Sequence, residues 1–283
     1  MRSDAVFPIA STTKQFTAAA VMQLVEAGKL SLDDPISRFV PSAPAAWSGI
    51  TLRHLLTHES GISDYTKVSG FLRKQGVYHH EPDELLQIVE QQALDSTPGT
   101  RFSYDNTGYV LLGFVIERAS NQSYSEYLRQ HIFLPLGMLN TALDGDADVV
   151  PKSAFGYSIN SGVAKIAPRL APSVTFSAGG LRSTADDLLK WDQALYTPRV
   201  LTRQSISSMF SDYGHGYGFG SFIEERHGHR LWDHGGDLPG FSAAFDRFPD
   251  DHLTVIVLSN EGDDAEGLAG RLADAFFDWR GKD

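Results

Sequence analysis

The sequence predicts an α+β fold in which an antiparallel sheet is flanked by helices and joined to a mostly helical region. Before about residue 135, apolar residues recur at the three-to-four-residue spacing of helices. After residue 213 they fall into short runs separated by turn residues, which is typical of hairpins and therefore of an antiparallel sheet. A last amphipathic segment, 268–279, returns to helical spacing and closes the chain.

Helices are expected where this spacing meets a start or stop signal. Gly28 ends the first helix, Pro82 begins another, and Ser123 with Glu126 has the spacing of a capping box. The expected helices are residues 11–27, 51–58, 82–92, 107–119, 123–133, 184–195, 202–209 and 268–279. The Pro-, Gly- and Ser-containing stretch 149–180 is expected to be loop.

Two hairpins are expected near the C-terminal end. Residues 217–225 and 229–233 flank the turn-like Arg226-His227-Gly228, and residues 241–248 and 253–259 flank Pro249-Asp250-Asp251. The apolar run 253–259 is typical of a central strand that is buried on both faces.

Composition limits the kinds of binding partner that we expect for this protein. The chain has 42% hydrophobic and 21% charged residues, and a net charge of −11 that argues against nucleic acid and anionic membranes. No apolar run approaches the roughly 20 residues of a membrane span, and no signal segment opens the chain. Because there is no cysteine, disulfides and a thiolate nucleophile are excluded. Small molecules are therefore the expected partners.

No linker separates independent domains, although the length suggests about two. We expect one intertwined unit, in which residues 1–20 and 175–283 form the sheet region and the start of the first helix. Residues 21–174 form the mostly helical region.

The first candidate for chemistry is Ser11 with Lys14. Residues three apart share one face of a helix, and an adjacent desolvated lysine can remove the proton that makes a serine nucleophilic. The pattern Ser-x-x-Lys is short enough to occur by chance. In this chain, however, Ser11 is the only serine followed by lysine at the third position.

Two further patterns contain groups that could assist. Tyr104 stands two residues before Asn106, so a phenol and an amide could share a site, although a loop tyrosine and a helix-capping asparagine explain them as well. His234 precedes Gly235-Gly236 at the end of an expected strand, where two glycines let the backbone pass close to a ligand.

Taken in this order, the three patterns resemble the serine beta-lactamase-like family, which includes class C beta-lactamases, DD-peptidases and related carboxylesterases. The resemblance covers nearly the whole chain. Further segments similar to the family are residues 7–17, 30–35, 54–61, 135–138, 177–181 and 239–241.

The resemblance implies a role for each of these residues and implies no cofactor. Ser11 is similar to the acylated nucleophile and Lys14 to its base, and Tyr104 to the residue that exchanges protons with leaving group and water. Asn106 is similar to the amide that orients the substrate.

The third pattern corresponds to the Lys-Thr-Gly segment of beta-lactamases, with His234 at the lysine position. By the same resemblance, the backbone N–H groups of Ser11 and of Asp237, which follows Gly235 and Gly236, form the oxyanion hole.

Histidine at position 234 changes the expected substrate. Its ordinary pKa is about 6.5, so it attracts a substrate carboxylate less than lysine does. This favours a carboxylesterase acting on neutral esters. A beta-lactamase or a D-amino-acid peptidase, and a catalytically inactive binding protein of the same family, stay open. The acyl group, the oligomeric state and the compartment do not follow from the sequence, although family members are often exported.

A second departure concerns the start of the chain, because family members usually have two strands before the nucleophile segment and ten residues precede Ser11 here. We therefore expect the free edge of 253–259 to be covered by the first residues, by the C-terminal helix or by another chain, or else the chain to be a truncated form with reduced stability.

No metal site is predicted. His54 and His58 have helical spacing but lack the glutamate of the metalloprotease pattern. The triplet Asp144, Asp146 and Asp148 lacks the glycine of a calcium loop.

Overall fold

The computed structural model describes residues 2–145, 149–262 and 264–281. Its main sheet is antiparallel with strand order β6-β7-β8-β9, which confirms the predicted fold class. The strands are β6 (Phe222–Arg226), β7 (His229–Leu238), β8 (Phe241–Phe248) and β9 (Leu253–Ser259). A smaller sheet has the order β1-β5-β2, with β1 (Phe7–Pro8), β2 (Ala142–Leu143) and β5 (Leu181–Ser183). A separate hairpin consists of β3 (Tyr157–Asn160) and β4 (Val163–Ile166).

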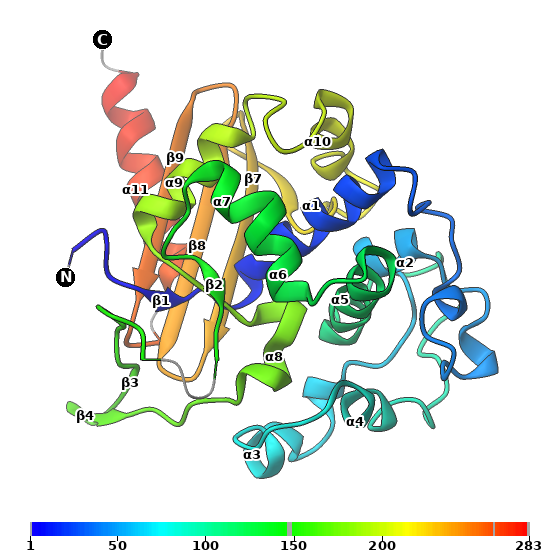
Figure 1. Ribbon diagram of the computed structural model, residues 1–283. Helices are drawn as coiled ribbons and strands as arrows, with labels where there is room; N and C mark the ends of the chain where they lie inside the picture. The colour runs from blue at the N-terminus through cyan, green and yellow to red at the C-terminus, as the bar shows by residue number, and fades with distance from the viewer. Residues whose placement is uncertain (1, 146–148, 263, 282–283) are drawn as a thin grey trace.

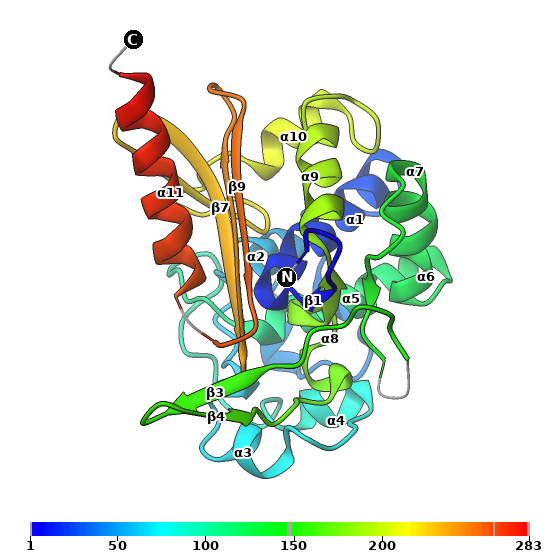
Figure 2. The same cartoon turned by 90° about the vertical axis from the view of Figure 1, so that its left-hand side faces the viewer.

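Helices lie on both faces of the main sheet and form the second region (Figures 1 and 2). The α-helices are α1 (Thr13–Glu26), α2 (Leu52–Leu56), α3 (Phe71–Gln75), α4 (Pro82–Gln87), α5 (Asn106–Ser120), α6 (Tyr124–Leu128), α7 (Leu134–Leu136), α8 (Pro172–Gly179), α9 (Ala185–Ala194), α10 (Arg203–Met209) and α11 (Ala265–Arg280). Short helical turns are η1 (Ala10–Thr12), η2 (Ile36–Arg38), η3 (Ala45–Trp47), η4 (Tyr65–Lys67) and η5 (Arg129–Phe133). Within the described residues, none of these helices is long and apolar enough to cross a membrane.

Helix α1 lies at the centre of the molecule, and almost every side chain along it is buried. One end of the segment, η1, packs on β7 and β8, and α1 itself packs on α5 and α8. The run Ala18-Ala19-Ala20 is fully buried, and such small side chains allow neighbouring helices to approach closely. Phe16 packs against Trp191 with ring centroids 4.7 Å apart. Helix α1 therefore joins the sheet region to the helical region and fixes the position of its first turn.

The hairpin strands β8 and β9 have the predicted bounds, but three predictions nearby are wrong. The strand expected at 217–225 begins at Phe222, because residues 217–221 form a tight turn against α1, closed by an isolated bridge between Tyr217 and Phe222. At Gly220 (φ +79°) an added Cβ would lie 2.6 Å from the carbonyl oxygen of Lys14. Strand β7 continues to Leu238, so His234 lies inside a strand and not at its end. The expected loop 149–180 contains the hairpin β3–β4 and helix α8.

The last strand also differs from its prediction. In β9 only Val255 is buried, whereas burial on both faces was expected. Helix α11 covers one face of β8 and β9 and not the edge of β9 (Figure 2). The first residues pair elsewhere, since Phe7 of β1 lies opposite Ser183 of β5. Among the described residues, neither the first residues nor helix α11 therefore covers the edge of β9. Pairing of this edge with another chain stays a prediction.

Candidate active site

Ser11 lies in the turn η1, directly before α1. The preceding residue, Ala10, has φ +46°, a left-handed backbone conformation that is uncommon for a residue with a side chain. Two bonds hold this turn in place: Ile9 N–H donates to Leu181 O at 2.9 Å, and Leu181 N–H donates to Thr13 Oγ1 at 3.1 Å. The neighbouring strand therefore fixes Ser11 in a strained turn, as is common at functional sites.

Lys14 is fully buried, and its ammonium group has three acceptors. Nζ donates to Ser11 Oγ at 3.1 Å, to Asn106 Oδ1 at 3.0 Å and to Ala178 O at 2.8 Å. Burial lowers the pKa of Lys14 to about 7, and the charges of two buried carboxyl groups oppose this only in part. A substantial fraction of Lys14 is thus neutral near pH 7 and can accept the Ser11 proton.

Tyr104 lies beside both groups. Its ring centroid is 4.9 Å from Lys14 Nζ, and the nearby Ser11 side chain lowers the pKa of its phenol. Burial raises the pKa of Tyr104 well above its ordinary value and outweighs the effect of Ser11. Tyr104 therefore stays protonated and can donate a proton to a leaving group.

Asn106 begins helix α5, but it is not the capping residue. Asp105 caps the helix, since its Oδ1 accepts a bond from Gly108 N–H at 2.5 Å. The Asn106 amide is held on both sides: Oδ1 accepts from Lys14, while Nδ2 donates to Asp64 Oδ2 and to Thr66 Oγ1, each at 3.2 Å. The capping explanation is therefore wrong, and the Asn106 side chain faces the candidate site.

His234 is buried in β7 on the opposite side of the site. Its Nδ1 lies 2.6 Å from Gly235 O, and its Nε2 lies 3.2 Å from the hydroxyl of Tyr217. A carbonyl oxygen can only accept, so Nδ1 carries the proton and Nε2 accepts from Tyr217. Burial, reinforced by the positive charge of Lys14, lowers the pKa of His234 to about 3. His234 is therefore neutral at pH 7.

The two glycines after His234 face opposite sides of the sheet. A Cβ added at Gly236 would lie 2.6 Å from the backbone nitrogen of Ser11, whereas one at Gly235 would lie 1.5 Å from Glu266 Oε1 on α11. Gly236 thus lets β7 approach the nucleophile turn closely. The next residue, Asp237, lines a pocket of about 180 Å³ together with Asn106 and Ala178. That Ser11 and Asp237 N–H groups form an oxyanion hole stays a prediction.

The two glycines provide a matched pair of variants. Gly236→Ala is expected to lower kcat/KM by roughly 10²-fold, because the added methyl displaces the nucleophile turn. Gly235→Ala should change kcat/KM by no more than about twofold, since the nearest atoms to the added methyl, Oε1, Cδ and Cγ of Glu266, belong to a flexible side chain that can turn away. Steady-state kinetics with an ester substrate, alongside melting temperatures, measures both. Equal losses in the two variants would contradict the assignment of Gly236 to the site.

The structure brings the predicted site residues to one place, apart from Gly235, which faces α11 on the other side of the sheet, and it adds residues that the sequence patterns did not single out. Asp64 and Thr66 hold Asn106, Tyr217 binds His234, and Ala178 O accepts from Lys14. Asp64 and Thr66 lie within five residues after the segment 54–61, and Ala178 lies within 177–181. The segments that resemble the family therefore lie next to these residues or include them. Nothing around Tyr217 indicated a site.

Metal ligation finds no support in the described part of the chain, which contains no group of three or more His, Asp or Glu side chains suited to a metal ion. Asp146 and Asp148 of the acidic triplet lie outside the described residues.

Similarity to known proteins agrees with this geometry. The chain is 31% identical to "Penicillin-binding protein 4*" of Bacillus subtilis, over 94% of this chain and 63% of that protein. It thus spans between about half and three fifths of the length of the curated relatives that it matches. A penicillin-binding protein from Bacillus halodurans has a similar structure, with TM-score 0.88 and 29% identity over 97% of this chain and 86% of that chain.

A D-amino acid amidase from Ochrobactrum anthropi SV3 is also similar in structure, with TM-score 0.85 and 28% identity over 99% of this chain and 86% of that chain. The family model described as "Beta-lactamase" matches residues 1–276, which include every residue of the candidate site. This match, together with the shared fold, makes the chain a member of the beta-lactamase family.

Proposed function

We propose that this protein is a serine hydrolase that forms an acyl-enzyme on Ser11 and acts most readily on small esters without a carboxylate beside the scissile bond. The contact between Lys14 Nζ and Ser11 Oγ, at 3.1 Å, carries the proposal, because it joins a nucleophile to a base that is neutral near pH 7.

The reaction needs two proton transfers in each half. Neutral Lys14 takes the proton of Ser11 while Oγ attacks the substrate carbonyl, and Tyr104 donates a proton to the departing alkoxide. In the second half a water replaces the alcohol: it gives its proton to the Tyr104 phenolate while its oxygen attacks the acyl carbon. Lys14 returns its proton to the departing Ser11 Oγ, which releases the carboxylic acid and restores both groups. Lys14, Asp64 and Thr66 hold the side-chain amide of Asn106 in a fixed orientation. This amide is therefore suited to orient the substrate.

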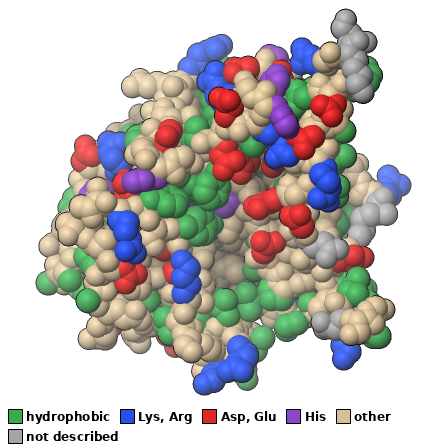
Figure 3. Space-filling model, turned by 180° about the vertical axis from the view of Figure 1, so that it is seen from behind, with side chains coloured by type: hydrophobic (Ala, Val, Ile, Leu, Met, Phe, Trp, Pro, Cys, Tyr) green, Lys and Arg blue, Asp and Glu red, His purple; other side chains and the backbone are tan. Residues whose placement is uncertain are grey.

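Preference for an uncharged acyl group follows from the charges around the site. His234 is neutral, and Asp237 is exposed beside the pocket. Burial, together with the charges of Asp237, Asp264 and Glu224, raises the pKa of Glu266 on the adjacent helix α11, which indicates a negative surrounding field. The face of the molecule seen in Figure 3 is hollowed, and acidic side chains gather along one side of the hollow. A substrate carboxylate is repelled in such a field.

Asp237 also supports a second candidate, an amidase acting on amino-acid amides. An exposed carboxylate at the pocket can bind a substrate ammonium group, and the similar structure from Ochrobactrum anthropi is named a D-amino acid amidase. Hydrolysis of D-phenylalanine amide faster than of p-nitrophenyl butyrate, with the difference lost in Asp237→Asn, would favour this candidate over the esterase.

The ester proposal predicts the ranking of two chromogenic substrates. We expect kcat/KM for p-nitrophenyl butyrate to exceed that for nitrocefin, whose carboxylate lies near the scissile bond. His234→Lys should shift the ratio toward nitrocefin by roughly tenfold, because a hydrogen bond to a charged group contributes about 1.5–3 kcal/mol. The reverse ranking in the unmodified protein would assign it to the beta-lactamases instead.

A further inference from the structure

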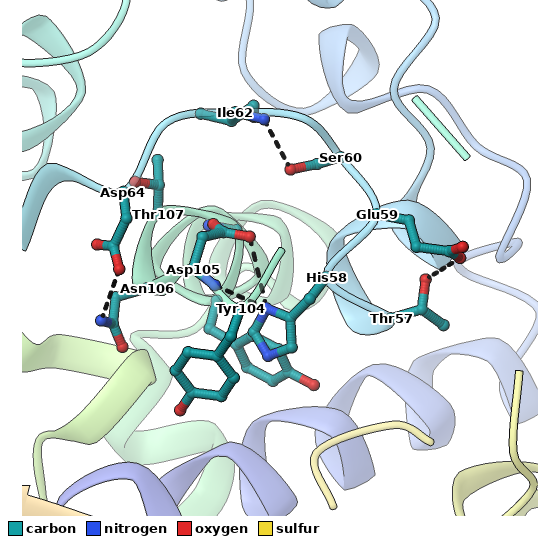
Figure 4. A network of polar contacts seen from close by, with 12 residues as sticks. Thr57, His58, Glu59, Ser60, Ile62, Asp64, Tyr104, Asp105, Asn106 and Thr107 are labelled. Atoms are coloured by element: carbon teal, nitrogen blue, oxygen red, sulfur yellow. Dashed lines mark hydrogen bonds and ion pairs between the residues drawn. The ribbon is translucent and has the colours of Figure 1, made fainter. Parts of the chain in front are cut away.

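His58 is a buried histidine that the proposed reaction does not use. It follows helix α2 with φ +56°, a left-handed conformation, and its side chain is fully buried. Figure 4 shows the ring directed at Asp105, with Tyr104 beside it. Aromatic rings surround it, including those of Tyr109 and Tyr217 at centroid distances of 5.0 Å and 4.8 Å.

His58 contacts each of the three residues that lead into helix α5. Its carbonyl oxygen accepts from Ser103 N–H at 2.8 Å. Its ring centroid lies 4.3 Å from that of Tyr104, with the planes tilted by 36°. Its Nδ1 accepts from Asp105 N–H at 3.2 Å. The backbone and the side chain of His58 thus hold the backbone of Ser103 and Asp105, on either side of Tyr104, and the ring of Tyr104 itself.

We propose that His58 is a positioning residue, which holds the Tyr104 phenol at the distance from Ser11 and Lys14 that proton transfer requires. This inference rests on the proposed function, because it assigns His58 to the same reaction. It adds a residue outside the Ser11, Lys14, Tyr104 and His234 set.

The chemical state of His58 suits this role. Asp105 N–H donates to Nδ1 at 3.2 Å, and Asp105 Oδ2 also lies 3.4 Å from the same nitrogen. With the lone pair of Nδ1 accepting the backbone bond, the ring proton resides on Nε2, which is buried without a hydrogen-bond partner among the described residues. Burial and the nearby charge of Lys14 hold the pKa of His58 well below its ordinary value, so the ring does not gain the second proton that would remove the acceptor. The bond from Asp105 N–H to Nδ1 is therefore not lost by protonation of the His58 ring, whereas the Asp105 carboxyl beside it, whose pKa burial raises to about 7, titrates in the same range as Lys14.

The segment 103–105 needs such a support because it has no regular secondary structure of its own before α5 begins at Asn106. Lys67 Nζ also donates to Tyr104 O, at 2.8 Å, but the Lys67 side chain is 66% exposed and so constrains the loop less. Since a displacement of about 1 Å in a catalytic group can reduce a rate roughly 10²-fold, the support affects the reaction directly.

Two amide variants of His58 distinguish a role in positioning Tyr104 from a role in core packing alone. The Asn oxygen in His58→Asn falls near the place of Nδ1 and retains the acceptor for Asp105 N–H, whereas the longer side chain in His58→Gln moves the acceptor away. We expect His58→Gln to react at least tenfold more slowly than His58→Asn, with kcat reduced and KM for p-nitrophenyl butyrate unchanged. His54→Asn, in helix α2 shortly before His58 but outside the site, is the control and should match the unmodified protein.

A double-mutant cycle tests whether His58 acts through Tyr104. In the Tyr104→Phe background, exchanging Asn for Gln at position 58 should leave the rate unchanged within about twofold, because the proton-donating group is already gone. Equal rates for the two amide variants, or losses that persist undiminished in the Tyr104→Phe background, would overturn the proposal.

The rate is measured in two ways, by ester turnover and by phosphonylation of Ser11 with a fluorophosphonate followed by intact mass. Melting temperatures confirm that each variant is folded under the assay conditions. If the unmodified protein is not labelled at Ser11, the proposed function itself fails. If it is labelled, and His58→Gln is labelled equally fast as His58→Asn, the function stands and the role of His58 is wrong.

Discussion

The Ser11→Ala variant is expected to lose about 10⁶-fold in kcat, which is the scale of effect when a serine hydrolase loses its nucleophile. Ser11 is the serine whose oxygen lies 3.1 Å from a buried lysine nitrogen, at a strained turn held by β5 and β7. A fluorophosphonate should therefore add one adduct to the unmodified protein and none to Ser11→Ala.

Ser123 provides the matched control for this prediction. It also stands at a helix start, where its Oγ accepts from Glu126 N–H at 3.3 Å, but the residue three positions after it is this glutamate and not a lysine. Ser123→Ala should lose about 1 kcal/mol of stability as a capping residue and keep its full rate and its adduct. An adduct on another serine, with Ser11→Ala still active, contradicts the mechanism.

The second large effect is expected at Lys14. Lys14→Met preserves the buried apolar stem but removes the base and the three hydrogen bonds of Nζ, so kcat/KM should fall by roughly 10²–10⁴-fold. Tyr104→Phe, which removes the proton donor, should fall within the same range. Lys29→Met, at an exposed position, is the control and should leave the rate unchanged.

The pH dependence of the unmodified protein follows from the same lysine. Burial lowers the pKa of Lys14 to about 7, and only the neutral amine can accept a proton. On acidification below pH 7, kcat/KM should therefore fall about tenfold per pH unit, and above pH 7 it should reach a plateau. A profile that is flat between pH 5 and 9, while Lys14→Met is inactive, would assign Lys14 a different role.

Local patterns predicted the elements whose signals are contained in a few neighbouring residues. Strands β8 and β9 have their predicted bounds because a turn of Pro249-Asp250-Asp251 separates two runs of strand-forming residues. The hairpin β3–β4 was missed because β4 is exposed along its whole length and Ile159 of β3 is exposed as well, so burial imposes no strong alternation on its sequence. Its turn uses Ser161 and Gly162, both with positive φ.

The sequence alone determined which residues could do the chemistry: Ser11 and Lys14 are joined by helical spacing, and resemblance to a family joined Tyr104, Asn106 and His234 to them. Only the tertiary structure decided how those groups behave. Burial makes Lys14 a base near pH 7 and keeps His234 neutral, and burial is a property of the packed molecule. The contacts of His58 with residues 103–105 likewise join segments about 45 residues apart, which no local pattern encodes.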